Sequence, residues 1–235
     1  MSRVGYEQVG VAMTCRGFEE YLLMFNLKEK ELPKGRVLDV AAGGSSFTAE
    51  ARSRGYDAYA ADPRYSRNAE EWIAEAAGEI IASTAKLEKL RDQFNWDYYG
   101  SPEMHHKGRA ASLERFKQHA RSAEGAACYQ EGKLPNLPYE DNSFSLVLCS
   151  HFLFLYSEQF GLNFHIESVA ELMRVTKPGG EIRIYPLIGL NWEPYAELEQ
   201  LLSAVHDRGG RTSLQPSNLP FIPGSTHYLQ IICFD

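Results

Sequence analysis

Apolar residues along the chain form two alternating patterns: short continuous runs, and stretches in which they recur every three or four residues. Continuous runs are typical of buried strands, whereas the three- and four-residue spacing is typical of amphipathic helices. The expected strands cover residues 36–40, 57–62, 127–130, 144–149, 181–185, 211–214 and 227–234. Helical spacing lies between most of them, as in residues 166–173 and 198–205. This alternation predicts an α/β fold with a mostly parallel, seven-stranded sheet and helices on both faces.

The last two expected strands are joined without a helix. Residues 211–214 and 227–234 face each other across a proline-rich loop. A parallel connection needs a long crossover that is usually helical, whereas an antiparallel connection does not. We therefore expect the last strand to run antiparallel to the rest of the sheet.

Residues 64–126 interrupt the alternation after the second strand. Apolar residues recur there at helical spacing in two stretches, which flank an aromatic, turn-rich segment at 94–102. We expect a helical insertion in this region. Residues 18–26 carry an amphipathic helical pattern, and residues 1–30 are expected to form a helical cap. The whole chain, 1–235, is expected to be one domain.

Composition and net charge disfavour some classes of function. The chain has 235 residues, of which 44% are hydrophobic and 23% charged, as in ordinary globular domains. Its net charge of −7 argues against a nucleic-acid partner, which would require a basic face. The four cysteines form no C-x-x-C pair, and no cluster of ligand residues predicts a metal site. Without a signal-peptide pattern or an apolar run of about 20 residues, we expect a cytoplasmic protein with no membrane span.

The end of the first strand carries the most informative segment. Asp39 precedes a turn of small residues at 41–46 (letters AAGGSS), and a helical pattern begins at Phe47. Small residues allow backbone N–H groups to approach a bound nucleotide or carboxylate. Asp62 ends the second strand, at roughly the 20-residue offset where an acid binds a ribose in nucleotide-binding units. The turn lacks the G-x-G-x-x-G pattern, which counts against a bound pyrophosphate.

Three motifs resemble those of class I S-adenosylmethionine-dependent methyltransferases. They are residues 38–43 (LDVAAG), 137–147 (LPYEDNSFSLV) and 172–180 (LMRVTKPGG). They occur in the order that the family shows. The resemblance implies a Rossmann-like fold, S-adenosyl-L-methionine as the cofactor, and methyl transfer to an acceptor that we expect to be a small molecule.

The resemblance also implies which residues hold the cofactor. These are Asp39, Ala41, Ala42, Gly43, Asp62, Pro63, Leu134 and Ser150. Asp39 and the small-residue turn would surround the methionine end, and Asp62 would hold the ribose. Pro63 and the backbone near Leu134 would contact the adenine, and the backbone at Ser150 would accept a hydrogen bond from the ammonium group.

A catalytic residue does not follow from the family, since many members act mainly by holding the acceptor in line with the methyl group. His151, directly after the fourth strand, is the candidate catalytic residue, because a histidine can accept a proton from a hydroxyl or amine. The alternative is a packed or capping histidine. His105 and His106 are expected on a solvated helix start.

The aromatic segment of the insertion has two interpretations. Residues 94–106 are expected to line the acceptor pocket opposite His151 and to close over it, with Tyr98 and Tyr99 contributing to binding. Alternatively, the aromatic side chains only anchor the insertion to the rest of the protein.

Two other functions stay open on the sequence. A non-catalytic protein that binds S-adenosylmethionine is compatible with Ala41 and Ser45, which replace the usual first and third glycines. A nicotinamide-dependent oxidoreductase is disfavoured by the missing third glycine and by the helix-free final strand pair. The sequence names neither the acceptor, nor the atom that is methylated, nor an oligomeric state.

Overall fold

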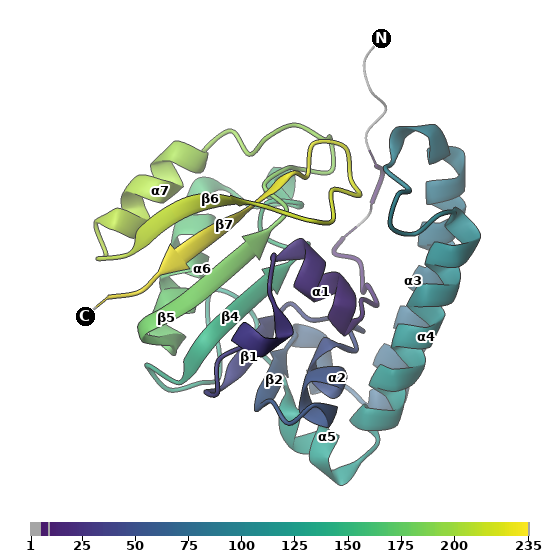
Figure 1. Cartoon of the computed structure of the whole chain (residues 1–235), viewed down its shortest axis with the longest axis horizontal. Coiled ribbons are helices and arrows are strands. Elements are labelled where there is room, and N and C mark those ends of the chain that lie inside the picture. The colour runs from purple at the N-terminus through teal and green to yellow at the C-terminus, as the bar shows by residue number, and fades with distance from the viewer. Residues whose placement is uncertain (1–5, 9, 235) are drawn as a thin grey trace.

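Seven strands form one twisted sheet in the computed structural model, which describes residues 6–8 and 10–234 (Figure 1). The strands are β1 (Val37–Val40), β2 (Ala58–Ala61), β3 (Tyr129–Gln130), β4 (Phe144–Ser150), β5 (Thr176–Tyr185), β6 (Arg211–Pro216) and β7 (His227–Ile232). Their order across the sheet is β3-β2-β1-β4-β5-β7-β6. Strand β7 is antiparallel to β5 and β6, whereas the other neighbouring pairs are parallel. The predicted α/β fold with an antiparallel last strand is confirmed.

Helices cover both faces of the sheet. They are α1 (Phe18–Met24), α2 (Phe47–Ser53), α3 (Ala69–Lys89), α4 (Pro102–Ala120), α5 (Ala123–Cys128), α6 (Leu162–Val175) and α7 (Leu198–His206). Four short 3-10 turns lie at Glu29–Glu31, Pro63–Ser66, Arg91–Gln93 and Ser157–Gln159. The expected helical insertion after the second strand therefore consists of α3, α4 and α5.

The strands alternate their side chains between two apolar cores. Leu38 and Val40 of β1 point to the face where α6 and α7 pack, and Val37 points to the opposite face, against α1 and α2. Successive side chains of a strand point to opposite faces, so one short apolar run supplies both cores. Asp39 shares the face of Val37 and is fully buried beneath α1. The sheet is thus fixed on both sides up to the ends of its central strands.

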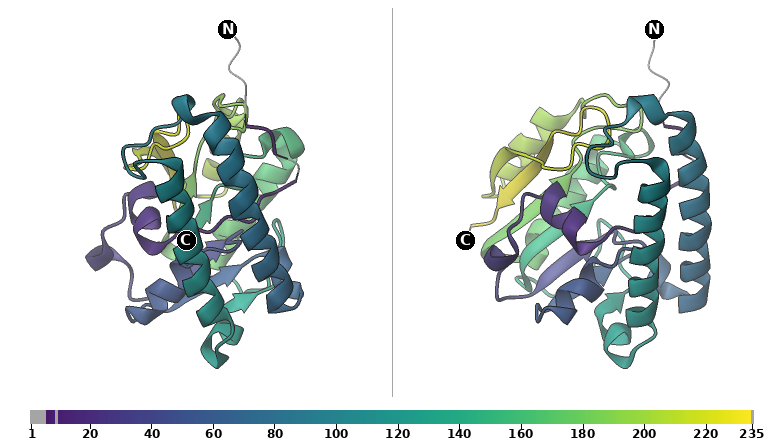
Figure 2. Two further views of the ribbon diagram at one scale, coloured as in Figure 1. Left: turned by 90° about the vertical axis from the view of Figure 1, so that its right-hand side faces the viewer. Right: turned by 45° about the vertical axis from the view of Figure 1, so that its right-hand side comes forward.

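Helices α3 and α4 stand side by side and antiparallel, and we call them the helical hairpin (Figure 2). The inner face of the hairpin packs on the sheet edge through Trp72 and Phe116, whose rings contact Tyr65 and Tyr129. Aromatic pairs of this kind add about 0.5–1.5 kcal/mol each to the burial of their area. The hairpin is therefore a fixed wall beside the sheet.

An extended segment before α1 crosses the molecule between the hairpin and the sheet (Figure 2). We call residues 11–16 the N-terminal strap. The carbonyl oxygens of Thr14 and Arg16 accept hydrogen bonds from the backbone N–H groups of Gly44 and Ser46, each at 3.0 Å. At its other end, the N–H group of Ala12 donates to the Tyr156 hydroxyl at 2.9 Å. Residues 1–30 therefore contribute this strap as well as the expected helix.

Candidate functional site

Three neighbouring strands end at the same edge of the sheet. Val40 of β1 pairs with Ala61 of β2 and with Cys149 of β4. The next residues along each strand, Ala41, Asp62 and Ser150, are therefore brought together. In open α/β sheets, ligands bind outside the carboxyl ends of the strands. The structure thus assembles at one edge the residues that the sequence places after three separate apolar runs.

Asp62 is the acidic group at this edge, and it is buried. Its carboxylate accepts hydrogen bonds from the backbone N–H groups of Gly43 at 3.1 Å and Arg64 at 2.9 Å, and it lies 3.6 Å from the Arg64 guanidinium. Burial raises the pKa of Asp62, and the hydrogen bonds and charge of Arg64 oppose that rise. A carboxylate has about four acceptor sites, so hydrogen-bonding capacity is left for a ligand.

A hollow of about 130 Å³ opens beside Asp62, and we call it the strand-end pocket. It is lined by Val11, Val40, Ala41, Asp62, Pro63, Arg64, Gly132, Lys133, Leu134, Phe152, Phe160 and Phe164. Four of the residues predicted for cofactor binding, Ala41, Asp62, Pro63 and Leu134, lie on its wall. The apolar lining around one acid fits a flat ring attached to a hydroxylated sugar.

The small-residue turn departs from the expectation that its N–H groups face a ligand. The N–H groups of residues 42–46 already donate to Ala61 O, Asp62 Oδ2, Thr14 O, Ala42 O and Arg16 O, in that order. A Cβ atom on Gly43, which has φ of 58°, would lie 3.2 Å from the Thr14 carbonyl oxygen. In this structure the turn is small because the N-terminal strap lies against it. Ala42 and Gly43 do not line the strand-end pocket.

Asp39 and Ser150 also lie outside the strand-end pocket. Both carboxylate oxygens of Asp39 accept from the Tyr21 hydroxyl, at 2.9 and 3.1 Å. Burial raises the pKa of Asp39 well above its usual value, and the hydrogen bond from Tyr21 opposes that rise. The Ser150 side chain is hydrogen-bonded to His151 Nδ1 at 2.8 Å. In the geometry seen here, Asp39 fixes α1 and Ser150 orients His151.

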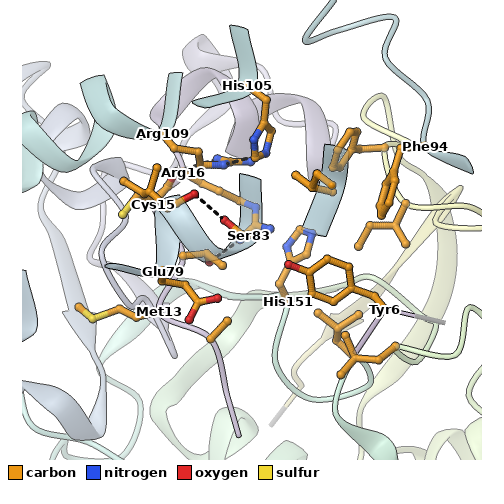
Figure 3. Close-up of a pocket in the computed structure, with 18 of the residues that line it drawn as sticks. Tyr6, Met13, Cys15, Arg16, Glu79, Ser83, Phe94, His105, Arg109 and His151 are labelled. Carbon is orange, nitrogen blue, oxygen red and sulfur yellow. Dashed lines mark hydrogen bonds between the residues drawn. The ribbon is translucent and has the colours of Figure 1, made fainter. Parts of the chain in front are cut away.

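A second cavity is lined by residues 12–16 of the strap, and we call it the hairpin cavity (Figure 3). It encloses about 90 Å³ between the strap, the helical hairpin and the loops that follow β4 and β5. Its polar side chains include Arg16, Glu79, His105, Arg109 and His151. Its apolar wall includes Ile80, Leu87, Phe94, Leu155, Trp192 and Phe221. The cavity is thus apolar at one end and charged at the other.

Arg109 anchors the charged end through a buried network. Its guanidinium lies 2.6 Å from a carboxylate oxygen of Glu20 and donates to the Cys15 carbonyl at 2.7 Å and to the Tyr99 hydroxyl at 2.9 Å. Its Nε donates to His105 Nε2 at 3.1 Å. Burial and the Arg109 charge lower the pKa of His105 to about 2, so this histidine is neutral.

His151 lines the hairpin cavity one residue past β4, and the next residue, Phe152, lines the strand-end pocket (Figure 3). The backbone of His151 has φ of 54°, and its N–H group donates to the Tyr185 carbonyl at 2.6 Å. Burial and the charges of Arg16 and Arg109 lower the pKa of His151 well below its usual value. No hydrogen bond to its Nε2 is formed by the described residues. The predicted catalytic residue is therefore a neutral imidazole on the cavity wall.

The structure corrects the expectation about His105 and places Tyr98 and Tyr99 outside the lining of the hairpin cavity. His105 is not solvated but buried, and its ring stacks on Phe221 at 5.5 Å. Tyr98 is 47% exposed, and Tyr99 donates its hydroxyl hydrogen to Glu20 rather than to the cavity. From the segment 94–106, the described cavity wall takes Phe94 and His105.

Several lining residues escaped the sequence reasoning. Arg16, Glu79 and Arg109 carry charge into the cavity from three segments far apart in the chain, which no local pattern connects. One signal was present: His105 and Arg109 are four residues apart, the spacing of neighbours on one helix face.

Two further findings concern residues 6–8 and 10–234. No group of three or more potential ligand side chains in this part of the chain could hold a metal ion. No helix there combines the length and the apolar character needed to cross a membrane.

Comparison with known proteins identifies the family. A family model described as a methyltransferase domain matches residues 101–184. The protein named "Uncharacterized protein MJ0045", from Methanocaldococcus jannaschii, is 30% identical over 201 residues, which cover 85% of this chain and 88% of that protein. The chain belongs to the class I S-adenosylmethionine-dependent methyltransferases. It is an enzyme, and S-adenosyl-L-methionine is its cofactor.

Solved structures with a similar backbone fold include two methyltransferases. One is a SAM-dependent methyltransferase from Methanosarcina mazei, with a TM-score of 0.48 and 12% identity, covering 88% of this chain and 96% of that one. The other is a TehB-like SAM-dependent methyltransferase from Corynebacterium glutamicum, with a TM-score of 0.46 and 14% identity, covering 88% of this chain and 83% of that one.

Proposed function

We propose that this methyltransferase holds its cofactor at the strand-end pocket and methylates a small molecule bound in the hairpin cavity. The observation that carries the proposal is that neighbouring residues of the strap line both hollows. Val11 of the strap lines the strand-end pocket, while Ala12 and Met13 line the hairpin cavity. The adjacent strands β1 and β4 lead into the two hollows, through Ala41 and His151 respectively.

The residues of the strand-end pocket suit the cofactor in charge and shape. The free acceptor sites of Asp62 fit the two ribose hydroxyl groups. Pro63 and Leu134 offer apolar contact to the adenine, and Ala41 leaves room near the end of β1. Asp39, Ala42, Gly43 and Ser150 would support this site from behind by fixing α1, the turn and His151.

When bound, S-adenosylmethionine supplies an electrophilic methyl group on a positively charged sulfur atom. The chain's own contribution is then positional, because a methyl transfer requires the acceptor atom in line with that group. The hairpin, the strap and the loops after β4 and β5 hold the acceptor and exclude water. Residues 64–126 serve as a wall over the acceptor, with Phe94 and His105 as the members of the aromatic segment that touch it.

His151 is suited to remove the proton that a hydroxyl or amine acceptor must lose. Its lowered pKa keeps the imidazole neutral and able to accept a proton at Nε2. Ser150 fixes the ring through Nδ1, at 2.8 Å. A weak base is sufficient here, since an oxygen or nitrogen atom becomes strongly acidic while it is being alkylated.

Size and charge support a small-molecule acceptor in a reducing compartment. The cavity of about 90 Å³ is lined by the strap and the hairpin, a size suited to a small molecule, and the net charge of −7 disfavours a nucleic acid. The four cysteines, all within the described residues, are free and buried. Free thiols are typical of cytosolic proteins, so we place the enzyme in the cytoplasm.

Calorimetry and product analysis test this proposal. The chain should bind S-adenosylmethionine and S-adenosylhomocysteine but not NADH. Incubation with S-adenosylmethionine carrying a labelled methyl group, together with a fractionated small-metabolite extract, should release S-adenosylhomocysteine and label one fraction. Label that enters only the protein or nucleic-acid fraction would contradict a small-molecule acceptor.

A further inference from the structure

The charged end of the hairpin cavity holds two guanidinium groups, of which only one is paired with an acid. Arg109 has Glu20 at 2.6 Å. Arg16 forms no ion pair with a described carboxylate, and its guanidinium donates a hydrogen bond to the hydroxyl of Thr14, at 2.5 Å. Both side chains line the cavity (Figure 3).

No described acid is paired with Arg16. Glu20 attracts the Arg16 charge, but its carboxylate is already bound to Arg109 and accepts from the Tyr99 hydroxyl. Asp39 is within electrostatic reach, but both of its carboxylate oxygens accept from the Tyr21 hydroxyl. His105 and His151 are neutral, and Arg109 adds repulsion, so that burial and this like charge lower the pKa of Arg16. A guanidinium keeps its proton in proteins. Arg16 therefore brings an unbalanced positive charge to a sheltered site, where an anion would be bound strongly.

The opposite wall of the cavity is apolar and consists mainly of aromatic rings that pack on one another. Phe94 stacks on Phe221 at 4.9 Å and meets Trp192 edge-to-face at 5.7 Å. Together with Leu87 these side chains form one buried cluster. Such a wall accepts a flat or branched hydrocarbon body and offers it no hydrogen bond.

Glu79 adds a hydrogen-bond acceptor to the wall of the hairpin cavity. It lines the cavity, and its Oε1 is buried without a hydrogen-bond partner among the described residues. Burial raises the pKa of Glu79. An N–H or O–H group of a ligand would satisfy this oxygen.

We propose that the methyl acceptor is a small apolar acid, whose anionic oxygen group is bound by Arg16 and whose hydrocarbon body lies against Leu87, Phe94, Trp192 and Phe221. This inference rests on the proposed function, because it takes the hairpin cavity as the acceptor site. A carboxylate matches the planar guanidinium fork best, since the pair can form two parallel hydrogen bonds. A hydroxyl or amine on the same molecule faces Glu79 and His151.

The test compares two probes of nearly the same shape, of which one is an anion and the other neutral: 3-phenyllactate and its primary amide. Binding is measured by calorimetry with the chain saturated with S-adenosylhomocysteine. The acid should bind at least about tenfold more tightly than the amide, which corresponds to about 1.4 kcal/mol. Equal affinities, or no binding of the acid at millimolar concentration, would overturn the proposal.

Variants of Arg16 assign the effect to this side chain. Arg16→Met should abolish the preference for the acid, and Arg16→Lys, which keeps the charge, should retain part of it. Arg208→Met, an exposed arginine after α7, is the matched control and should change neither affinity. If Arg16→Met instead weakens S-adenosylhomocysteine and leaves the acid unaffected, Arg16 serves the cofactor and the inference is wrong. Failure of the wild-type chain to bind S-adenosylhomocysteine would refute the proposed function itself. A failure of the proposed function is therefore distinguishable from a failure of this inference.

Discussion

Replacement of Asp62 by asparagine probes the strand-end pocket most informatively, because this carboxylate has both a structural and a proposed binding role. It accepts from Gly43 N at 3.1 Å and from Arg64 N at 2.9 Å. Asparagine has one carbonyl oxygen, so one of these buried donors loses its acceptor, at a cost of about 1–3 kcal/mol in the free energy of unfolding. A charge-assisted hydrogen bond to the ribose is also lost, worth about 1.5–3 kcal/mol.

The expected effect on binding is therefore a rise of about 10- to 150-fold in the Kd for S-adenosylhomocysteine. Calorimetry gives the Kd, and urea unfolding of the same preparations gives the stability. Asp57→Asn is the matched control, because Asp57 precedes the same strand and its exposed ion pair with Arg52 at 3.1 Å is worth about 0–1 kcal/mol. If stability falls as expected and the Kd is unchanged, Asp62 only holds the turn and the ribose assignment is refuted.

Three further predictions concern the hairpin cavity. His151→Asn should lower kcat by about 10²- to 10⁴-fold with little change in the Kd of the cofactor. The wild-type rate should show no inflection near pH 6.5, because the lowered pKa keeps His151 neutral as the pH falls through that value. A wild-type inflection there, or a fully active variant, would contradict the role of His151 as a base. His105 has a pKa lowered to about 2 in the folded state, so the unfolded chain binds its proton first and the free energy of unfolding should fall by about 1.36 kcal/mol per pH unit below about pH 6.5. His105→Gln should make that fall shallower in denaturant titrations at several pH values, and an unchanged slope would show that His105 is not the group responsible. Glu20→Gln should lower the free energy of unfolding by about 3–5 kcal/mol, because it leaves Arg109 without its buried anion. Tyr98→Ala, at an exposed ring, should leave both the melting temperature and the turnover unchanged. Equal effects of the two substitutions would refute the stabilising role of the buried network around Arg109.

The sheet edge could be predicted because each of its residues follows a local pattern. Ala41, Asp62 and Ser150 end apolar runs, and parallel pairing brings the ends of such runs together. The helical insertion was predictable for the same reason, from the spacing of its apolar residues. These features depend on periodicity within short stretches of sequence.

The cavity could not be predicted, because its contacts join distant segments. The strap has no helical or strand period, and its partners are backbone groups of Gly44 and Ser46 about 30 residues further along. Arg109 meets Cys15 and Glu20 only once the hairpin has packed beside the sheet. The sequence leads us to expect His105 on a solvated helix start, whereas the aromatic ring of Phe221 and the Arg109 side chain bury it.

A crystal structure of the chain with S-adenosylhomocysteine tests the central claim most directly. The account predicts adenine between Pro63 and Leu134, the ribose hydroxyl groups on Asp62, and the sulfur atom directed past the strap toward His151 and the hairpin cavity. A nucleoside bound inside the hairpin cavity, or a sulfur atom directed away from His151, would contradict it.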